Sequence, residues 1–73
     1  MTFSSILIDQ NILAGHPVIK GTRIPVSLIL NLFSHGYTFE KIINEYPELT
    51  IKDIKSAVHY AEDRIKREEI YSA

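Results

Sequence analysis

Apolar residues recur with the period of an α-helix in the second half of the chain. Between Thr38 and Pro47 they stand at positions i, i+3, i+4 and i+7, in the order Phe39, Ile42, Ile43 and Tyr46. This spacing makes one apolar stripe, which is typical of a helix that lies on a core with its other side in water. Thr38 can cap the start of this helix, and Pro47 ends it after about Tyr46. We therefore predict a short helix in this segment.

The segment before it carries a wider apolar surface. With Ser27 as a possible cap and Gly36 as a left-handed stop, it predicts a helix that runs to about His35. Its apolar residues cover roughly 200° of the helical wheel, twice what one core surface requires. They are Val26, Leu28, Ile29, Leu30, Leu32 and Phe33. Such a helix is either central in the fold or faces a second subunit.

The last predicted helix is the longest. Thr50, followed three residues later by Asp53, resembles the capping box that starts many helices. From there to about residue 69, one side of the helix is apolar and carries Ile51, Ile54, Val58, Ala61 and Ile65. The opposite side is polar and carries Lys52, Ser56, His59, Asp63 and Arg67. We predict that the apolar side lies on the core.

The first third of the chain predicts short strands and turns. Ile6 and Ile8 alternate with their neighbours as in a short strand, and a turn is expected from Asn11 to Gly15. The segments 17–20 and 23–26 flank Gly21-Thr22, which suits a type II′ hairpin turn with glycine at the first central position. The proline near each end of this hairpin cannot donate a backbone hydrogen bond, so the paired strands must be short. We expect a small β arm or hairpin.

Together these elements predict a single domain of 73 residues with no second domain. It would comprise a β arm (1–26), a helical helix-turn-helix core (27–69) and a tail (70–73). The predicted fold class is mainly α, a three-helix homeodomain-like or winged helix-turn-helix domain. The chain has no cysteine and therefore no disulfide, and a domain with a core of this size is only marginally stable. A homodimer, formed through the first helix and the arm, is therefore the expected assembly.

The tight connection between the last two helices has the arrangement of a DNA-binding helix-turn-helix, whose second helix enters the major groove. The residues best placed to contact bases are Lys52, Lys55, Ser56 and His59, with Thr38, Lys41 and Thr50 beside them near the phosphates. The formal net charge is -1, and no segment is strongly basic, so a DNA site must be local or shared between subunits. The alternative is that the helices are only a scaffold, because such packings occur in many proteins that never contact DNA.

Two further features can bind a protein partner. Arg23 follows a tight turn, and its guanidinium can hold a carboxylate or phosphate of a partner. The alternative is an internal interaction with a helix C-terminus or with an acidic residue such as Glu45 or Glu48. In the tail of the last helix, Ile65, Ile70 and Tyr71 are candidate anchors in an otherwise charged segment. The alternative for the tail is a solvated helix end with paired charges at i, i+4.

Nothing in the sequence indicates catalysis, a metal or a cofactor. His16, His35 and His59 are far apart and lack the spacing of metal ligands. There is no phosphate-binding glycine loop and no nucleophile elbow, and the extended front holds one acid, Asp9. No apolar run approaches the length of a membrane span, and the N-terminus lacks a basic leader. We expect a cytoplasmic protein that is not an enzyme.

Several strings of the sequence resemble a bacterial family first catalogued as domain of unknown function 433. They are the run from Gly15 to Val26, then Gly36, residues 38–42, the run from Tyr46 to Thr50, and Asp53-Ile54. The resemblance covers about residues 7–61, and within it Ser56 departs from the pattern, since a small apolar residue is expected there. Members of this family resemble VapB-type antitoxins, which bind PIN-like ribonuclease toxins and repress their own operon.

This resemblance predicts an antitoxin that neutralises a PIN-like toxin and binds operator DNA as a homodimer, with half-sites about one helical turn apart. The alternative is a protein-binding adapter that does not contact DNA. The family supplies no set of functional residues that can be carried over to this chain.

Overall fold

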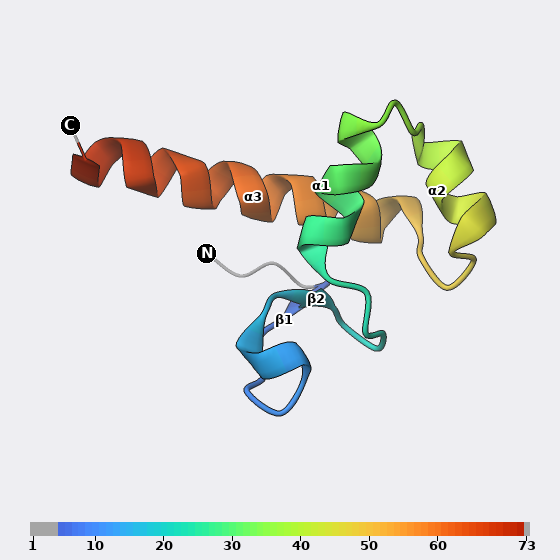
Figure 1. Cartoon of the computed structure of the whole chain (residues 1–73), viewed down its shortest axis with the longest axis horizontal. Coiled ribbons are helices and arrows are strands. Elements are labelled where there is room, and N and C mark those ends of the chain that lie inside the picture. Colours follow the sequence, from blue (N-terminus) through green and yellow to red (C-terminus); the bar gives the residue numbers. More distant parts are fainter. Residues whose placement is uncertain (1–4, 73) are drawn as a thin grey trace.

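The computed structural model describes the backbone of residues 5–72 and the side chains of residues 5–67. In chain order, the described elements are β1 (Ile6–Leu7), a 3₁₀ turn (Leu13–Gly15), β2 (Val18–Ile19), α1 (Val26–Ser34), α2 (Phe39–Glu45) and α3 (Ile51–Ser72). Figure 1 shows α1 crossing the first half of α3, the strands beyond one end of α1, and the second half of α3 projecting away from the other helices. The predicted class, mainly α with three helices and a short β arm, is confirmed.

The β arm differs from the predicted hairpin in its pairing. β2 pairs antiparallel with β1, with Ile6 opposite Ile19 and Leu7 opposite Val18. The expected partner, residues 23–26, also pairs with β2: Val18 and Pro25 form an antiparallel bridge, Ile19 N donates to Ile24 O and Val26 N donates to Pro17 O, both at 2.9 Å. Proline has no N–H to extend a ladder, and α1 begins directly after Pro25. The prediction of the arm is therefore confirmed, but its main strand pair is 6–7 with 18–19.

The turn inside the arm also differs from the predicted type. Thr22 N donates to Ile19 O at 3.0 Å, so the turn spans residues 19–22 and Gly21 is its third residue. Gly21 has φ +83°, as type II turns require at that position. The type II′ prediction was wrong because the turn begins one residue earlier along the chain than the hairpin pattern suggested.

The ends of α1 show one wrong and one correct prediction. Its N-cap is Pro25, with no side-chain hydrogen bond, so Ser27 is not the cap. Val26 N instead donates to Pro17 O at 2.9 Å, and the fixed φ of proline suits the start of a helix. Gly36 ends the helix with φ +86°, and Tyr37 N donates back to Leu32 O at 3.1 Å, a Schellman motif.

The core is built around four isoleucines, one from each main element. Ile19 of β2, Ile29 of α1, Ile42 of α2 and Ile54 of α3 are all fully buried. Val26 and Ile29 of α1 belong to this cluster, and Leu28, Leu32 and Phe33 pack against it. Most of the wide apolar arc of α1 is thus covered by its own chain, while Leu30, at the edge of the arc, is 37% exposed. The helix is central, so the arc does not require a second subunit.

The buried side of α3 differs from the predicted one. Ile54 and Ala57 are fully buried, because α1, α2 and the arm cover that side. Three residues of the predicted apolar side lie in solvent: Ile51, Val58 and Ile65 are 50%, 39% and 55% exposed. These three are seven residues apart, so they form a row along the helix. α3 therefore has an apolar row outside the core.

None of the helices in the described part of the chain has both the length and the apolar content needed to cross a bilayer.

Replacing Ile54 by Ala should lower the free energy of unfolding by about 2–4 kcal/mol, since it leaves a cavity where all elements meet. The matched control is Ile8→Ala, because Ile8 is 55% exposed in the arm and should lose less than about 1 kcal/mol. Urea denaturation followed by circular dichroism measures both. Equal losses would contradict the central place of Ile54.

Candidate nucleic-acid and partner interface

The α2–α3 unit is held by a buried connection and a double cap. Leu49 of the connecting segment is 2% exposed, and its N–H donates to Tyr46 O at 2.9 Å. At the start of α3, Asp53 N donates to Thr50 Oγ1 and Thr50 N donates to Asp53 Oδ2, both at 3.1 Å. This confirms the predicted capping box. The reciprocal bonds set the first residue of α3 and so the direction of every side chain after it.

Two lysines and a histidine form the candidate nucleic-acid surface. Lys52, Lys55 and His59 are all exposed and lie within about 60° of one another around α3, spaced i, i+3 and i+7. We call these three residues the basic strip. Between residues 51 and 60 the one acidic residue is Asp53, which is engaged in the cap. Ser56 is half-buried at the margin of the strip. The strip can contact an anionic surface along two turns of helix.

Three other predicted DNA contacts already have roles within the fold. Thr38 Oγ1 accepts from Lys41 N at 3.2 Å and so caps α2, as predicted. Thr50 caps α3 in the same way. Lys41 Nζ lies 4.3 Å from the centroid of the Tyr37 ring, in a cation–π contact. Thr38 and Thr50 each precede a different helix, α2 and α3, and Thr50 lies directly before the turn of α3 that carries Lys52.

Arg23 is exposed and forms no ion pair with any residue in the described part of the chain. The internal pair with Glu45 or Glu48, the alternative drawn from the sequence, is therefore not formed. Glu45 instead accepts a hydrogen bond from Tyr37 Oη at 3.5 Å. The Arg23 guanidinium lies in solvent at the edge of the arm, where it is accessible to a partner.

In the described part of the second half of α3, charged side chains surround Ile65. Arg67 Nε lies 3.1 Å from Asp63 Oδ2, and Lys66 Nζ lies 3.9 Å from Glu62 Oε1, the two i, i+4 pairs predicted from the sequence. Such exposed pairs contribute little to stability. Ile65 is 55% exposed among them. The side chains of the other two predicted anchors, Ile70 and Tyr71, lie outside the described residues.

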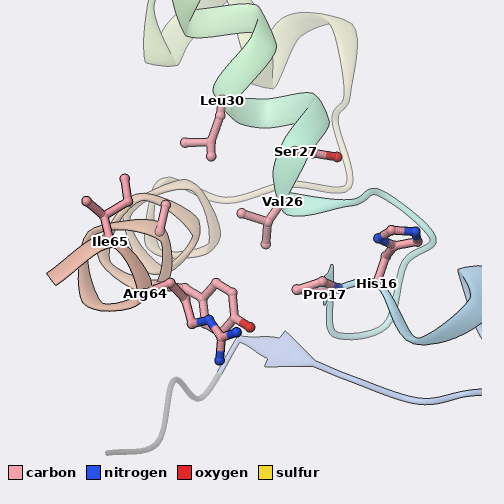
Figure 2. A pocket seen from close by; sticks show the side chains of 9 residues that line it. His16, Pro17, Val26, Ser27, Leu30, Arg64 and Ile65 are labelled. Atoms are coloured by element: carbon pink, nitrogen blue, oxygen red, sulfur yellow. The ribbon is translucent and has the colours of Figure 1, made fainter. Parts of the chain in front are cut away.

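Two shallow hollows beside α3 were not predicted. One, of about 270 Å³, lies between the arm, the start of α1 and the middle of α3. In Figure 2, Leu30 and Ile65 lie at one side of it and His16 and Pro17 at the other. The second, of about 430 Å³, is lined by Leu30, Val58, Ala61, Glu62, Ile65 and Lys66. No local pattern could reveal these hollows, because their walls come from segments far apart in the sequence.

The row Ile51, Val58 and Ile65, by contrast, has a signal in the sequence, namely its spacing of seven residues. The helical wheel alone places this row in the core together with Ile54, because all these positions share one half of the wheel.

Elsewhere, no three His, Asp or Glu side chains within the described residues gather as metal ligands would.

Comparison with known proteins gives a consistent result. A family model described as a protein of unknown function (DUF433) matches residues 6–61. An uncharacterized protein of Sinorhizobium fredii is 36% identical over 54 residues, which are 74% of this chain and 24% of the relative. The crystal structure of a DUF433 member protein from Anabaena variabilis ATCC 29413 superposes with a TM-score of 0.77 at 33% identity, covering 88% of this chain and 66% of that one. The chain thus spans about a quarter of the curated relative and about two thirds of the solved one.

Thr50→Ala should lower the free energy of unfolding by about 1 kcal/mol, because it removes the oxygen that accepts from Asp53 N. Thr50→Ser is the matched control, since serine keeps that oxygen and should lose no more than a few tenths of a kcal/mol. Thermal unfolding followed by circular dichroism measures both variants. If the two were destabilised equally, the hydroxyl would not be acting as a cap.

Proposed function

This chain belongs to the DUF433 family, and we propose that it is a non-catalytic binding protein of the antitoxin type. In this proposal the first half of α3 contacts operator DNA, while exposed residues of the arm and of the second half of α3 contact a PIN-like ribonuclease toxin. Binding of the toxin covers its nuclease cleft, and binding of DNA represses the operon that encodes both proteins.

The observation that carries the DNA part of the proposal is the basic strip. Its three side chains are exposed on the first turns of the second helix of a helix-turn-helix, the region that enters the major groove in proteins that read DNA this way. The capping box gives this helix a defined start at the surface. The nearest acid in sequence, Asp53, accepts a hydrogen bond from Thr50 N in that cap, which directs its carboxylate toward the start of the helix.

One copy of the strip is a weak DNA ligand. Affinity for DNA depends on how many phosphates lysine and arginine neutralise, and the strip has two lysines in a chain of net charge -1. A homodimer doubles the number of phosphate contacts at one site, because both copies bind together. The proposal therefore requires two copies on the DNA.

The toxin part of the proposal is supported by exposed groups away from the basic strip. Arg23 lies at the edge of the arm with no ion pair among the described residues, and its planar guanidinium suits a carboxylate of a partner. Ile65 offers an apolar anchor on a charged helix, the pattern by which helices enter grooves. Ile70 and Tyr71 continue the same helix in sequence.

A second candidate function is a protein-binding adapter without DNA. It is favoured by one observation, the exposed row Ile51, Val58 and Ile65, which is an apolar surface on a chain of only 73 residues. In that case the helix-turn-helix positions the row, and the basic strip is solvated.

For the DNA contact, we expect salt-sensitive binding to the DNA upstream of the protein's own gene, and Lys52→Ala should weaken it. Removing the charge that neutralises one phosphate should lower the slope of log affinity against log salt by about one. Lys20→Ala is the control, because Lys20 is an exposed lysine in the turn of the arm. Fluorescence anisotropy at several salt concentrations measures the slope. The absence of binding at low ionic strength would favour the adapter.

For the toxin contact, we expect the chain to inhibit a ribonuclease encoded by the neighbouring gene. Arg23→Ala should weaken this inhibition by roughly tenfold or more if the guanidinium is paired in the complex. Lys52→Ala serves as the control, because the proposal assigns that exposed lysine to DNA and not to the toxin. A titration of nuclease activity against each variant measures the effect. A neighbouring product that lacks ribonuclease activity would remove the toxin from the proposal.

A further inference from the structure

Five exposed residues follow one line along α3. They are Ile51, Lys55, Val58, Glu62 and Ile65, at spacings of four, three, four and three residues. Residues at these spacings lie within about 80° of one another around an α-helix and extend for about 21 Å along it. We call this line the α3 ridge. It alternates apolar, basic, apolar, acidic and apolar side chains, and it borders the side of the helix that carries the buried Ile54 and Ala57.

The side chains of the α3 ridge are complementary to those of a second α3 ridge that runs in the opposite direction. A twofold axis through Val58 pairs Ile51 with Ile65, since both are seven residues from Val58. It also brings Lys55 within one residue, about 1.5 Å along the helix, of the position opposite Glu62. An apolar residue thus meets an apolar residue, and a base meets an acid. Two identical helices that pack antiparallel about a twofold axis require this relation, because residue i then contacts residue j and residue j contacts residue i. We propose that the α3 ridge is the interface of a homodimer in which two copies of α3 pack antiparallel.

The central contact of this pair is between the two copies of Val58, and Ile51 of each copy lies opposite Ile65 of the other. Helices that pack in this way stand about 8–10 Å apart, within reach of these side chains. On the rim, Lys55 of each copy lies beside Glu62 of the other. A parallel pair would instead place Lys55 beside Lys55 and Glu62 beside Glu62, so the charges select the antiparallel arrangement.

The hollow beside the ridge completes the apolar part of the interface. Leu30 of α1 is 37% exposed, and together with Val58, Ala61 and Ile65 it forms the apolar wall of the hollow of about 430 Å³. In the antiparallel pair, Ile51 of the second copy comes to this place, opposite Ile65. The hollow is then filled by an apolar side chain, and Leu30 packs against the second copy.

The pairing also determines where the two basic strips lie. The twofold axis passes between the two helices, in a direction about 90° around α3 from the ridge. Lys52 and His59 of both copies point along this axis on one side, and α1 lies on the other. The two copies of Lys52 are then about 20 Å apart, which follows from the rise of the helix and the distance between axes. This is shorter than the roughly 34 Å between half-sites one turn apart, so both strips would contact one stretch of duplex. The dimer itself does not rest on the proposed function.

Charge reversal tests the interface in solution. Sedimentation equilibrium should show a dimer whose dissociation constant rises about tenfold in Lys55→Glu and in Glu62→Lys, because each substitution brings like charges together. The double variant, Lys55→Glu with Glu62→Lys, should return to within about threefold of the natural chain, since the pairs re-form with opposite signs. Val58→Asp should raise the constant at least about 100-fold, and Ile8→Asp in the arm is its control. Circular dichroism verifies that each variant remains helical.

Cross-linking tests the antiparallel direction. The chain has no cysteine, so each introduced thiol is unique. Val58→Cys should form a covalent dimer on mild oxidation, and a mixture of Ile51→Cys with Ile65→Cys should form a mixed disulfide. Ile51→Cys alone should remain uncross-linked, because its thiols lie at opposite ends of the pair.

Three results would overturn the proposal. They are a natural chain that stays monomeric at high micromolar concentration, a dimer unaffected by Val58→Asp, and an Ile51→Cys variant that cross-links to itself. If the chain is monomeric and Val58→Asp abolishes binding to a different protein, the ridge belongs to that partner and not to a second copy.

Discussion

The structure depends on the burial of Ile54 of α3 against the isoleucines of the other elements. Ile19, Ile29 and Ile42 belong with it to one buried cluster, which joins α3 to the arm and to both other helices. Ile54 lies in the first turns of a helix that runs from Ile51 to Ser72. Only the beginning of α3 is therefore needed to close the core. The second half of the helix projects away from the other helices (Figure 1).

The capping box and Ile54 together determine which residues of α3 are exposed. The two hydrogen bonds between Thr50 and Asp53 set where the helix starts, and the burial of Ile54 sets its rotation about its own axis. Once both are set, Lys52 and His59 must point outward, while Ile51, Val58 and Ile65 lie between them and the core. One helix thus provides a buried side, the α3 ridge and the basic strip.

The two exposed surfaces of α3 share Lys55, which belongs to the basic strip and to the ridge. In the proposed dimer Lys55 lies beside Glu62 of the other copy, so the part of the basic strip left for DNA would be Lys52 and His59.

The sequence by itself determined the elements, most of their ends and the family. These signals act through neighbours in the chain, so they could be interpreted without a structure. They are the helical spacing of apolar residues, the caps formed by Thr38 and by Thr50 with Asp53, and the helix stop at Gly36. Other features were decided only by the tertiary structure. They are the partner of β2, the cap at Pro25, the solvent exposure of Val58 and Arg23, and the hollows beside α3. Each of these depends on which distant segment covers a residue. The spacing of apolar residues shows that a helix has an apolar side, but only packing decides which part of that side its own chain buries and which part it leaves for another.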